Sequence, residues 1–532
     1  MKKSIKILMA VLSGLLLTPG WFQWGTGVIL FVAFIPLLLV EHEHYSERKH
    51  RSSGSIVWYA ALTFFIFNLL TTWWVKNASW VGVIAALIIN TSVMTFTFWL
   101  FHMVHRRLGD RLGYLSLVLF WTASEFLYIN ALVNFPWLVL GNGFANDVRL
   151  VQWYEYTGAL GGSIWILVVN GLLARIIIGL RNKIKISDQL NLVSWTLGFL
   201  LFPIVFSLVR FYTYEEEDWP FEVVVVQPNI DPYMKFVTMP QETQTDFLLS
   251  VIDSLISPET DYVVGPETFF NDNVWEDQLE DNRGIQDIRK LVKRYPRVKV
   301  VIGATTYRLY TQPSEYTETC RPIKNGALRY DSFNTALQID STGYIPLYHK
   351  SRLVTGVEFM PYTRYLGFLE KITVRLGGAF RSHGTQASRD AFSAPGEMSK
   401  VGPVICWESV FGEYVTDYIK DAGATMLFII TNDGWWGNTP GHRQHNAFAH
   451  LRAIETRRSI ARSANTGISS LVDQRGVELS RLGWWKRGGL KGILNGNTHL
   501  TFYVKYGDYL GRISLFLAVI MLLFSFVRKR VK

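Results

Sequence analysis

The chain has few cysteines and few charged residues for its length. Only Cys320 and Cys406 occur among 532 residues, and charged residues make up 18% of the sequence. Two thiols allow one disulfide at most. The sequence also lacks a Walker A loop, a Gly-x-Gly-x-x-Gly fingerprint, a short internal repeat and a low-complexity tract. These absences argue against a phosphate-loop enzyme, a dinucleotide-binding domain and a repeat architecture.

A metal-ligand pattern is missing as well. His442, His445 and His450 lie close together in the sequence, but no cysteine or carboxylate accompanies them at a spacing typical of zinc sites. We therefore expect no metal and no other cofactor. We expect His445 to have a structural role, as a hydrogen-bond partner for groups of a helix or a loop.

Apolar residues are abundant instead. They make up 49% of the chain, and the mean hydropathy of +0.16 is higher than is usual for a soluble protein of this size. Eight runs are long enough to span a bilayer, or nearly so, and they lie at about 5–19, 22–41, 55–75, 80–104, 114–130, 162–180, 194–212 and 509–528. The first run could also be a signal peptide, but the second follows it at once without a small-residue cleavage site. A retained helix is therefore expected.

Lysine and arginine are concentrated in alternate connections between these runs. The basic connections contain Lys2, Lys3, Lys6, Arg48, Lys49, Arg51, Arg106, Arg107, Arg111, Arg181, Lys183, Lys185, Arg528, Lys529, Arg530 and Lys532. The other connections hold only Lys76 and Arg149. This asymmetry predicts that both termini are cytoplasmic and that residues 213–508 lie on the opposite side. The net charge of +10 then needs no nucleic-acid partner, because orientation and contact with anionic lipid account for it.

The segment 213–508 has a different pattern. Short β-branched runs bounded by Gly, Pro, Asn or Asp predict strands at 221–226, 261–264, 298–303, 335–339, 402–405, 424–431 and 469–473. Helical periodicity predicts helices at 243–257 and 442–462. The alternation indicates a layered α/β domain. We expect three parts: a seven-helix membrane domain at 1–212, an extracytoplasmic domain at 213–508, and an eighth membrane helix with its tail at 509–532.

Reactive polar residues lie at three predicted strand ends, two of them at strands given above and one at a short run that starts at Tyr344. Glu267 follows the strand at 261–264, Lys350 closes a run that starts at Tyr344, and Cys406 follows the strand at 402–405. A thiol, a carboxylate and an ammonium are the parts of a nucleophilic acyl-transfer site. The carboxylate can take the thiol proton, and the ammonium can stabilise negative charge on a tetrahedral intermediate. By spacing alone, a structural role for any one of them is the more frequent case.

Longer motifs make this pattern specific. They are 227–230 (Gln-Pro-Asn-Ile), 265–268 (Gly-Pro-Glu-Thr), 406–408 (Cys-Trp-Glu), 431–437 (Thr-Asn-Asp-Gly-Trp-Trp-Gly), 444–445, 452–455, Arg462 and 465–467, with Pro136-Trp137, Gly158 and Asn170 in the membrane half. On these residues the segment 213–508 resembles the nitrilase superfamily, an αββα sandwich with Glu, Lys and Cys in this order. The whole chain resembles the membrane-embedded apolipoprotein N-acyltransferases of that superfamily.

The resemblance implies a site and a reaction. It implies that Glu267 is the general base, Lys350 the oxyanion stabiliser and Cys406 the nucleophile that carries a thioester. The supporting residues would be Glu358, which orients Lys350, Trp407, whose backbone N–H is a second oxyanion donor, and Glu408, which holds the turn at Cys406. Phe236 occupies a position where a functionally sensitive Trp is common, so a substrate contact is expected there. The implied fold class is an eight-helix transmembrane bundle plus an αββα sandwich domain.

The implied substrates are both membrane-anchored. A phospholipid similar to phosphatidylethanolamine would donate the acyl chain, and the N-terminal amine of a diacylglyceryl-cysteine lipoprotein would accept it, in the bacterial inner membrane with the catalytic domain in the periplasm. Alternatives are a membrane-anchored amidase acting on a small amide, and a receptor or transporter with an inert nitrilase-like domain. A disulfide between Cys320 and Cys406 would consume the nucleophile. The apolar stretch 361–372 is compatible with domain core and with an interfacial lid.

Overall fold

The computed structural model describes residues 1–235, 238–323, 328–359 and 382–531. The chain forms two compact units. One contains residues 1–76, 80–214 and 506–532, and the other contains residues 77–79 and 215–505.

The first unit is built from helices. Its α-helices are α1 (Lys3–Leu17), α2 (Leu30–Ala33), α3 (Ile35–Ser46), α4 (Val57–Thr72), α5 (Trp80–Leu108), α6 (Asp110–Ile129), α7 (Tyr154–Arg181), α8 (Leu190–Thr213) and α16 (Tyr509–Val531). Eight helical segments of the described chain are long and apolar enough to cross a membrane: Lys3–Trp21, Gly27–Ser46, Ser53–Asn77, Trp80–Leu108, Asp110–Ile129, Tyr154–Arg181, Ile186–Thr213 and Tyr509–Arg528. Each coincides with one of the eight predicted runs, which confirms the predicted number of spans.

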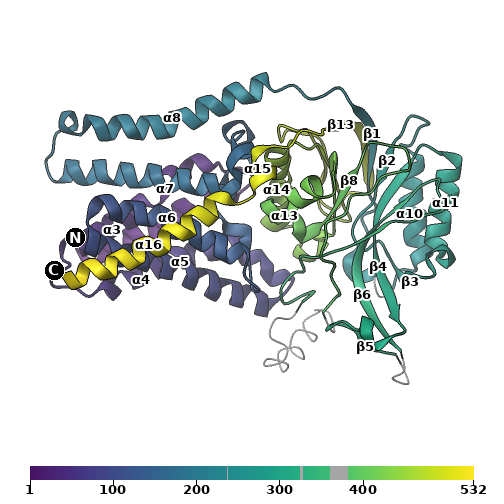
Figure 1. Cartoon of the computed structure of the whole chain (residues 1–532), viewed down its shortest axis with the longest axis horizontal. Helices are drawn as coiled ribbons and strands as arrows, with labels where there is room; N and C mark the ends of the chain where they lie inside the picture. Colours follow the sequence, from purple (N-terminus) through teal and green to yellow (C-terminus); the bar gives the residue numbers. More distant parts are fainter. Residues whose placement is uncertain (236–237, 324–327, 360–381, 532) are drawn as a thin grey trace. The chain divides into compact units, whose positions relative to one another are not determined.

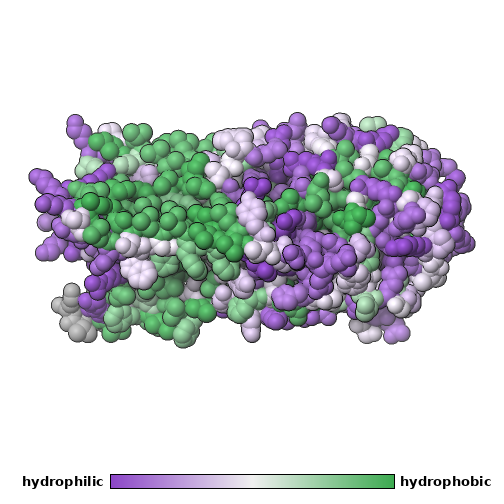
Figure 2. Space-filling model, turned by 90° about the horizontal axis from the view of Figure 1, so that it is seen from above, coloured by the Kyte–Doolittle hydropathy of each residue, from purple (hydrophilic) through white to green (hydrophobic). Residues whose placement is uncertain are grey.

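The helices of this unit pack side by side. The C-terminal helix α16 lies against α5, α6 and α7, although it is separated from them by the whole second unit in sequence (Figure 1). Helix α8 packs mainly along α7. Only 11% of the most apolar 18-residue stretch of Ile186–Thr213 is buried. Figure 2 shows apolar side chains gathered over the surface of the helical unit. An apolar outer surface of this kind is suited to contact with lipid tails.

A buried polar cluster joins α3 to α5. Glu41 Oε1 lies 2.6 Å from Nδ1 of His102 and 3.0 Å from Nδ1 of His105, and all three side chains are fully buried. His105 Nε2 also lies 2.9 Å from Asp110 Oδ1 at the start of α6. This cluster was not predicted, because Glu41 lies at the end of its apolar run.

The connection between α6 and α7 is shorter than the sequence suggested. The predicted spans leave residues 131–161 between them, but α7 begins at Tyr154 and continues through a kink at Gly158, where φ is 61°. Short 3-10 turns fill the rest: η5 (Pro136–Leu138), η6 (Leu140–Phe144) and η7 (Val148–Leu150). The left-handed backbone at the kink favours glycine. The Gly-rich sequence therefore marks a bend within the helix, where a loop was expected.

The second unit contains two β-sheets. The strands are β1 (Pro220–Gln227), β2 (Tyr262–Val264), β3 (Phe270–Trp275), β4 (Lys299–Tyr310), β5 (Arg321–Pro322), β6 (Arg329–Ile339), β7 (Leu347–His349), β8 (Val401–Ile405), β9 (Met426–Thr431), β10 (Ile460–Ala464), β11 (Ser469–Val472), β12 (Glu478–Leu482) and β13 (Gly488–Asn495). The larger sheet has the order β13-β1-β2-β4-β6-β5, with β3 on β4 and β7 on β6. The smaller sheet has the order β12-β11-β10-β9-β8.

Helices cover the outer face of each sheet. α10 (Gln241–Asp253) and α11 (Arg283–Arg294) lie on the larger sheet, and α13 (Gly412–Lys420) and α14 (Pro440–Thr456) lie on the smaller one (Figure 1). The sheets face each other through contacts such as β1 with β10 and β4 with β9. Two short helices complete the unit, α9 (Pro232–Lys235) and α15 (Phe502–Tyr506). The predicted fold class, an eight-helix transmembrane bundle plus an αββα sandwich, is confirmed.

The predicted strands are all present, but both predicted helices extend too far, and the helix expected over 243–257 ends at Asp253. The helix expected over 442–462 ends at Thr456, and Arg457 adopts the left-handed conformation before strand β10 begins. β10 is buried on both faces, so its residues have no alternation that distinguishes a strand from a helix. Strands β3, β5, β10, β12 and β13 and helices α11 and α13 were not predicted.

Candidate active site

Three residues from separate strand ends meet in one buried site. Glu267 follows β2, Lys350 follows β7 and Cys406 follows β8. Their exposed fractions are 5%, 1% and 8%. Lys350 Nζ donates a hydrogen bond of 3.1 Å to Glu267 Oε1. The structure thus brings together the three residues that the sequence singled out, across 139 positions between Glu267 and Cys406.

A second carboxylate and an amide complete the polar arrangement. Lys350 Nζ also donates to Glu358 Oε1 at 2.9 Å. The side-chain amide of Asn334, on β6, donates to Glu267 Oε1 at 2.7 Å and to Glu358 Oε1 at 3.0 Å. Asn334 was not predicted as a site residue, because the strand was expected to begin only at Thr335. A polar side chain within a strand that is buried on both faces would have been the signal to look for.

The charges in this site act on one another in a low-dielectric environment. Burial alone would lower the pKa of Lys350, but the carboxylates of Glu267 and Glu358 raise that pKa well above its usual range, so the ammonium stays charged. Burial raises the pKa of the Cys406 thiol well above its usual range; the charge of Glu267 raises it further and that of Lys350 lowers it. The resting thiol is therefore protonated and needs a base before it can attack.

The backbone around these residues is strained. Cys406 has a φ of 50° and Thr268, directly after Glu267, has a φ of 48°. Non-glycine residues seldom adopt the left-handed backbone conformation, because it is strained, and such strain is often found at functional sites. Gly303 on β4 lies against the turn at Glu267 and Thr268. A Cβ atom at Gly303 would come within 2.7 Å of Glu267 Cα. Glycine at this position permits the close approach of β4 to the turn.

Glu408 links the Cys406 turn to the Lys350 strand. Its Oε2 accepts from Ile405 N at 2.9 Å, and its Oε1 accepts from Ser351 N at 2.7 Å. Three buried tyrosine hydroxyls also donate to this carboxylate: Tyr348, Tyr414 and Tyr418. Both oxygens of Glu408 accept hydrogen bonds, so this carboxylate fixes the positions of Ile405, next to Cys406, and Ser351, next to Lys350. Trp407 is buried in the same turn, η11 (Cys406–Val410).

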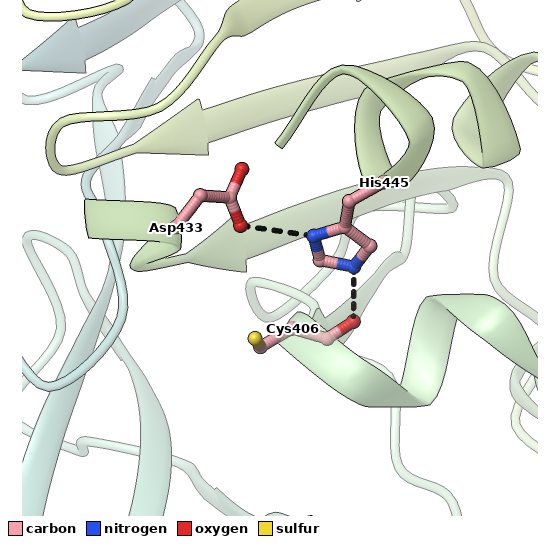
Figure 3. Close-up of side chains that lie close together, drawn as sticks. All are labelled: Cys406, Asp433 and His445. Atoms are coloured by element: carbon pink, nitrogen blue, oxygen red, sulfur yellow. Dashed lines mark hydrogen bonds and ion pairs between the residues drawn. The ribbon is translucent and has the colours of Figure 1, made fainter. Parts of the chain in front are cut away.

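His445 contacts Cys406 from the other side. One ring nitrogen, Nδ1, lies 2.9 Å from Asp433 Oδ1, and the other, Nε2, lies 3.2 Å from the backbone oxygen of Cys406 (Figure 3). Ser409 Oγ donates to the same backbone oxygen at 2.7 Å. The three residues look like a Cys-His-Asp set, but the imidazole contacts the main chain of Cys406, and the figure shows the sulfur turned away from it. His445 therefore supports the turn, as the sequence analysis expected of it.

Cys406, Asp433 and His445 also place three ligand-type atoms within 4.8 Å of one another. The charge beside them argues against a cation at this point. Arg462 Nη2 donates to Asp433 Oδ2 at 2.7 Å, and both side chains are fully buried. Burial would raise the pKa of Asp433, but Arg462 and His445 hold it below its usual range. The guanidinium already neutralises the carboxylate, so this donor set fits a hydrogen-bonded support of the turn better than a metal centre.

A second buried lysine borders the site. Lys235 Nζ donates to the backbone oxygen of Glu267 at 3.2 Å and to Thr268 Oγ1 at 3.3 Å. Burial lowers its pKa to about 7, and the charge of Glu267 only partly opposes this. Lys235 was not predicted as a site residue. The neighbouring Phe236 and the stretch 361–372 lie outside the described residues.

Cys320 lies apart from this arrangement. It is buried just before β5, its sulfur accepts a hydrogen bond of 3.5 Å from Arg329, and neither cysteine is in a disulfide. The thiol of Cys406 is thus available as a nucleophile. A buried thiol with a carboxylate and an ammonium beside it can carry out acyl transfer through a covalent intermediate.

Two family models match the chain. The apolipoprotein N-acyltransferase N-terminal domain matches residues 13–172, and the carbon-nitrogen hydrolase model matches residues 223–495, just over half of the chain. Among solved structures, a glutamine-dependent NAD+ synthetase from Acinetobacter baumannii is similar, with a TM-score of 0.34 and 13% identity, covering 52% of this chain and 45% of that chain. That likeness is too distant to inform function.

Similar proteins extend over nearly the whole length. An apolipoprotein N-acyltransferase from Chlorobaculum tepidum is 28% identical, covering 98% of this chain and 97% of that protein. Proteins of the same name from Geobacter metallireducens and Thermotoga maritima are 27% and 25% identical, each covering 98% of this chain and 96% and 94% of the relative. The chain therefore belongs to the carbon-nitrogen hydrolase family, in its membrane-embedded apolipoprotein N-acyltransferase group.

Proposed function

We propose that this multi-pass membrane protein transfers an acyl chain from a phospholipid to the N-terminal amine of a diacylglyceryl-cysteine lipoprotein, through a thioester on Cys406. One observation carries the proposal: Lys350 bridges Glu267 and Glu358 in a buried site whose charges act on the Cys406 thiol. The family membership and the eight apolar helices supply the context of a membrane-anchored substrate.

In the first half-reaction Glu267 takes the proton of the Cys406 thiol. The sulfur attacks the ester carbonyl carbon of the phospholipid, and the negative charge that develops on the carbonyl oxygen is stabilised by Lys350. The backbone N–H of Trp407 is the second donor in this scheme. The intermediate then collapses, the ester C–O bond breaks, and the lysophospholipid leaves as an alcohol with the proton from Glu267. Glu358 orients Lys350 throughout, and Phe236 contributes to the substrate wall.

In the second half-reaction the lipoprotein amine attacks the thioester carbonyl. Glu267 accepts a proton from the attacking nitrogen, the C–S bond breaks, and the thiolate of Cys406 regains a proton. The products are an amide and the free thiol. Glu267 serves as base and then as acid in each half, as expected for two-step covalent catalysis.

The finer assignments belong to the same proposal. The donor is a phosphatidylethanolamine-like lipid. The protein sits in the bacterial inner membrane with residues 213–508 in the periplasm and both termini in the cytoplasm, and residues 1–212 and 509–532 form the membrane part. The alternation of basic loops supports this orientation. Access from the outer leaflet would let both membrane-anchored substrates reach one site.

Mass spectrometry of the intact protein tests the reaction. Incubation with phospholipid alone is expected to add one acyl mass, and peptide mapping is expected to place it on Cys406. Cys406→Ala and Cys406→Ser should show no adduct and no transfer to a diacylated lipopeptide.

The matched control is Cys320→Ala, which removes the other buried thiol and should retain both the adduct and the transfer. An acyl adduct on Cys320, or full transfer by Cys406→Ala, would overturn the proposal.

A further inference from the structure

A pocket in the helical unit contains a carboxylate that its fold uses only in part. The pocket is bounded by α5, α6 and the turn after α6, and its cavity volume of about 30 Å³ leaves room for a group the size of one or two water molecules. Its polar lining includes Asn90, Ser124, Glu125 and Tyr128, and its apolar lining includes Leu138 and Val139. All of these residues belong to one compact unit.

The two oxygens of Glu125 have different roles. Oε1 accepts from Leu140 N at 2.8 Å and from Trp121 Nε1 at 3.0 Å, so it ties the turn after α6 to the helix. Oε2 is shielded from solvent and makes no hydrogen bond with the described residues, although the Ser163 hydroxyl of α7 also interacts with this carboxylate. A structural role therefore accounts for one oxygen and leaves the other unexplained.

The facing helix repeats this pattern. The side chain of Asn90, on α5, is 2% exposed. Its Oδ1 accepts from the hydroxyl of Tyr128, while its Nδ2 is buried without a partner in the described part of the chain. Within a bilayer, unsatisfied polar groups are especially unfavourable, and ionisable side chains in membrane spans commonly mark functional sites. An acceptor and a donor left open in one pocket indicate a ligand that has both kinds of group.

The charge of the pocket defines the ligand further. Glu125 is the acidic lining residue, and none of the lining residues that the structure describes carries a positive charge. A cationic group on the ligand would complement the carboxylate, and its N–H bonds would satisfy Oε2. The pocket lies in a unit of membrane-spanning helices, so a ligand that enters from the bilayer is an amphiphile whose apolar part can contact Leu138 and Val139.

We infer that this pocket binds the primary ammonium group of a membrane amphiphile, with Glu125 Oε2 as its acceptor and Asn90 Nδ2 as a donor to an oxygen of the same head group. The inference deepens the proposed function, because both proposed substrates carry a primary amine: the head group of the donor lipid and the N-terminus of the acceptor lipoprotein. It assigns Glu125 a binding role in addition to its structural one.

The test uses the full-length Cys406→Ala protein in phosphatidylcholine nanodiscs, so that no thioester forms. A membrane-soluble carbodiimide modifies carboxyl groups in apolar surroundings, and peptide mass spectrometry measures the modified fraction at Glu125. Adding phosphatidylethanolamine is expected to reduce this fraction at least threefold. A second arm adds a diacylated lipopeptide with a free α-amine or with an acetylated one. Protection by phosphatidylethanolamine, by the free lipopeptide or by both supports the inference and identifies the source of the ammonium.

The reference site is Glu155, a carboxylate of the same unit that is paired with Arg210 at 2.7 Å. Its modification should not change with lipid. Glu125 modification that neither amine-bearing amphiphile changes, or no modification of Glu125 at all, overturns the inference. In a parallel measurement Glu125→Gln keeps an oxygen for Leu140 and Trp121, so the fold should persist while the rise in thermal midpoint caused by phosphatidylethanolamine is lost. Acyl transfer itself is tested separately at Cys406, so failure of one does not imply failure of the other.

Discussion

At the scale of single residues, two buried lysines of the site have opposite properties. Lys350 faces two carboxylates, which raise its pKa well above the usual range. Lys235 donates instead to a carbonyl oxygen and a hydroxyl, and burial lowers its pKa to about 7. The same side chain is thus a permanent cation in one position and a titrating group in the other. The charges of Glu267 and Glu358 outweigh burial at Lys350, whereas the charge of Glu267 only partly opposes burial at Lys235.

The lowered pKa of Lys235 predicts how stability depends on pH. The pKa of a solvated lysine is 10.5, so between pH 7 and pH 10 the unfolded chain holds a proton on this side chain that the folded chain lacks. Stability contributed by this group therefore increases as pH rises through that range, and it is constant below about pH 7. Lys235→Met removes the contribution.

Thermal unfolding of the wild type and of Lys235→Met in detergent, at pH 7 and pH 9.5, measures the effect. The midpoint of the wild type relative to that of the variant is expected to increase by several degrees at the higher pH. A difference between the two proteins that is the same at both pH values would contradict the prediction.

At the scale of secondary-structure elements, the ends of β8 and β9 are held by α14. Cys406 begins a turn with left-handed backbone, and its carbonyl oxygen is held by Ser409 and His445. His445 is in turn held by Asp433, in the turn η12 (Asp433–Trp436) after β9. Strained conformations persist only where the surroundings overdetermine them. Contacts with the main chain of Cys406 therefore help to position its thiol.

His445→Ala is therefore expected to slow thioester formation by about 100-fold, the order of loss that a displacement of about 1 Å produces. Loss of the buried hydrogen bonds should also destabilise the fold by about 1–3 kcal/mol. His445→Gln keeps a donor toward the carbonyl oxygen of Cys406 and should recover part of the rate.

The rate of acyl-adduct formation, measured by quenched mass spectrometry, checks this positioning role. The alkylation rate of Cys406 by iodoacetamide provides a second readout, because it reports access to the thiol without substrate. Equal adduct rates in the wild type and in both variants would show that the turn does not need His445.

At the scale of the whole molecule, loop charge determines orientation. Basic residues gather in alternate loops, and the same alternation is expected to keep residues 213–508 away from the cytoplasm. A single cysteine introduced on a background of Cys320→Ser and Cys406→Ala tests the topology. Asp277→Cys places a thiol on the exposed surface of the second unit, and Lys183→Cys places one in an exposed basic loop.

A membrane-impermeant maleimide added to intact spheroplasts is expected to label Asp277→Cys and to leave Lys183→Cys unlabelled until the cells are lysed. The reversed pattern would contradict the predicted orientation, and mass spectrometry of the purified chains gives the labelled fraction.

Much of the architecture was predictable because its causes are local. An apolar run of about 20 residues defines a span, and an alternation of short β-branched runs with helical stretches defines a layered domain. These patterns predicted all eight spans and the strands that place Glu267, Lys350 and Cys406. Strand β10 is buried on both faces and so lacks the alternation that prediction needs. In β12 (Glu-Leu-Ser-Arg-Leu) the burial alternates, but the apolar residues do not.

The amino-acid sequence by itself determined the chemistry available to the site, since a thiol, a carboxylate and an ammonium are properties of single residues at the ends of recognisable strands. Only the tertiary structure decided how these groups act. Asn334 joins both carboxylates, Asp433 and His445 support the backbone of Cys406, and Glu125 presents a second oxygen to a pocket. These relations depend on residues far apart in the chain, and their electrostatic consequences arise from burial and proximity, which no local pattern encodes.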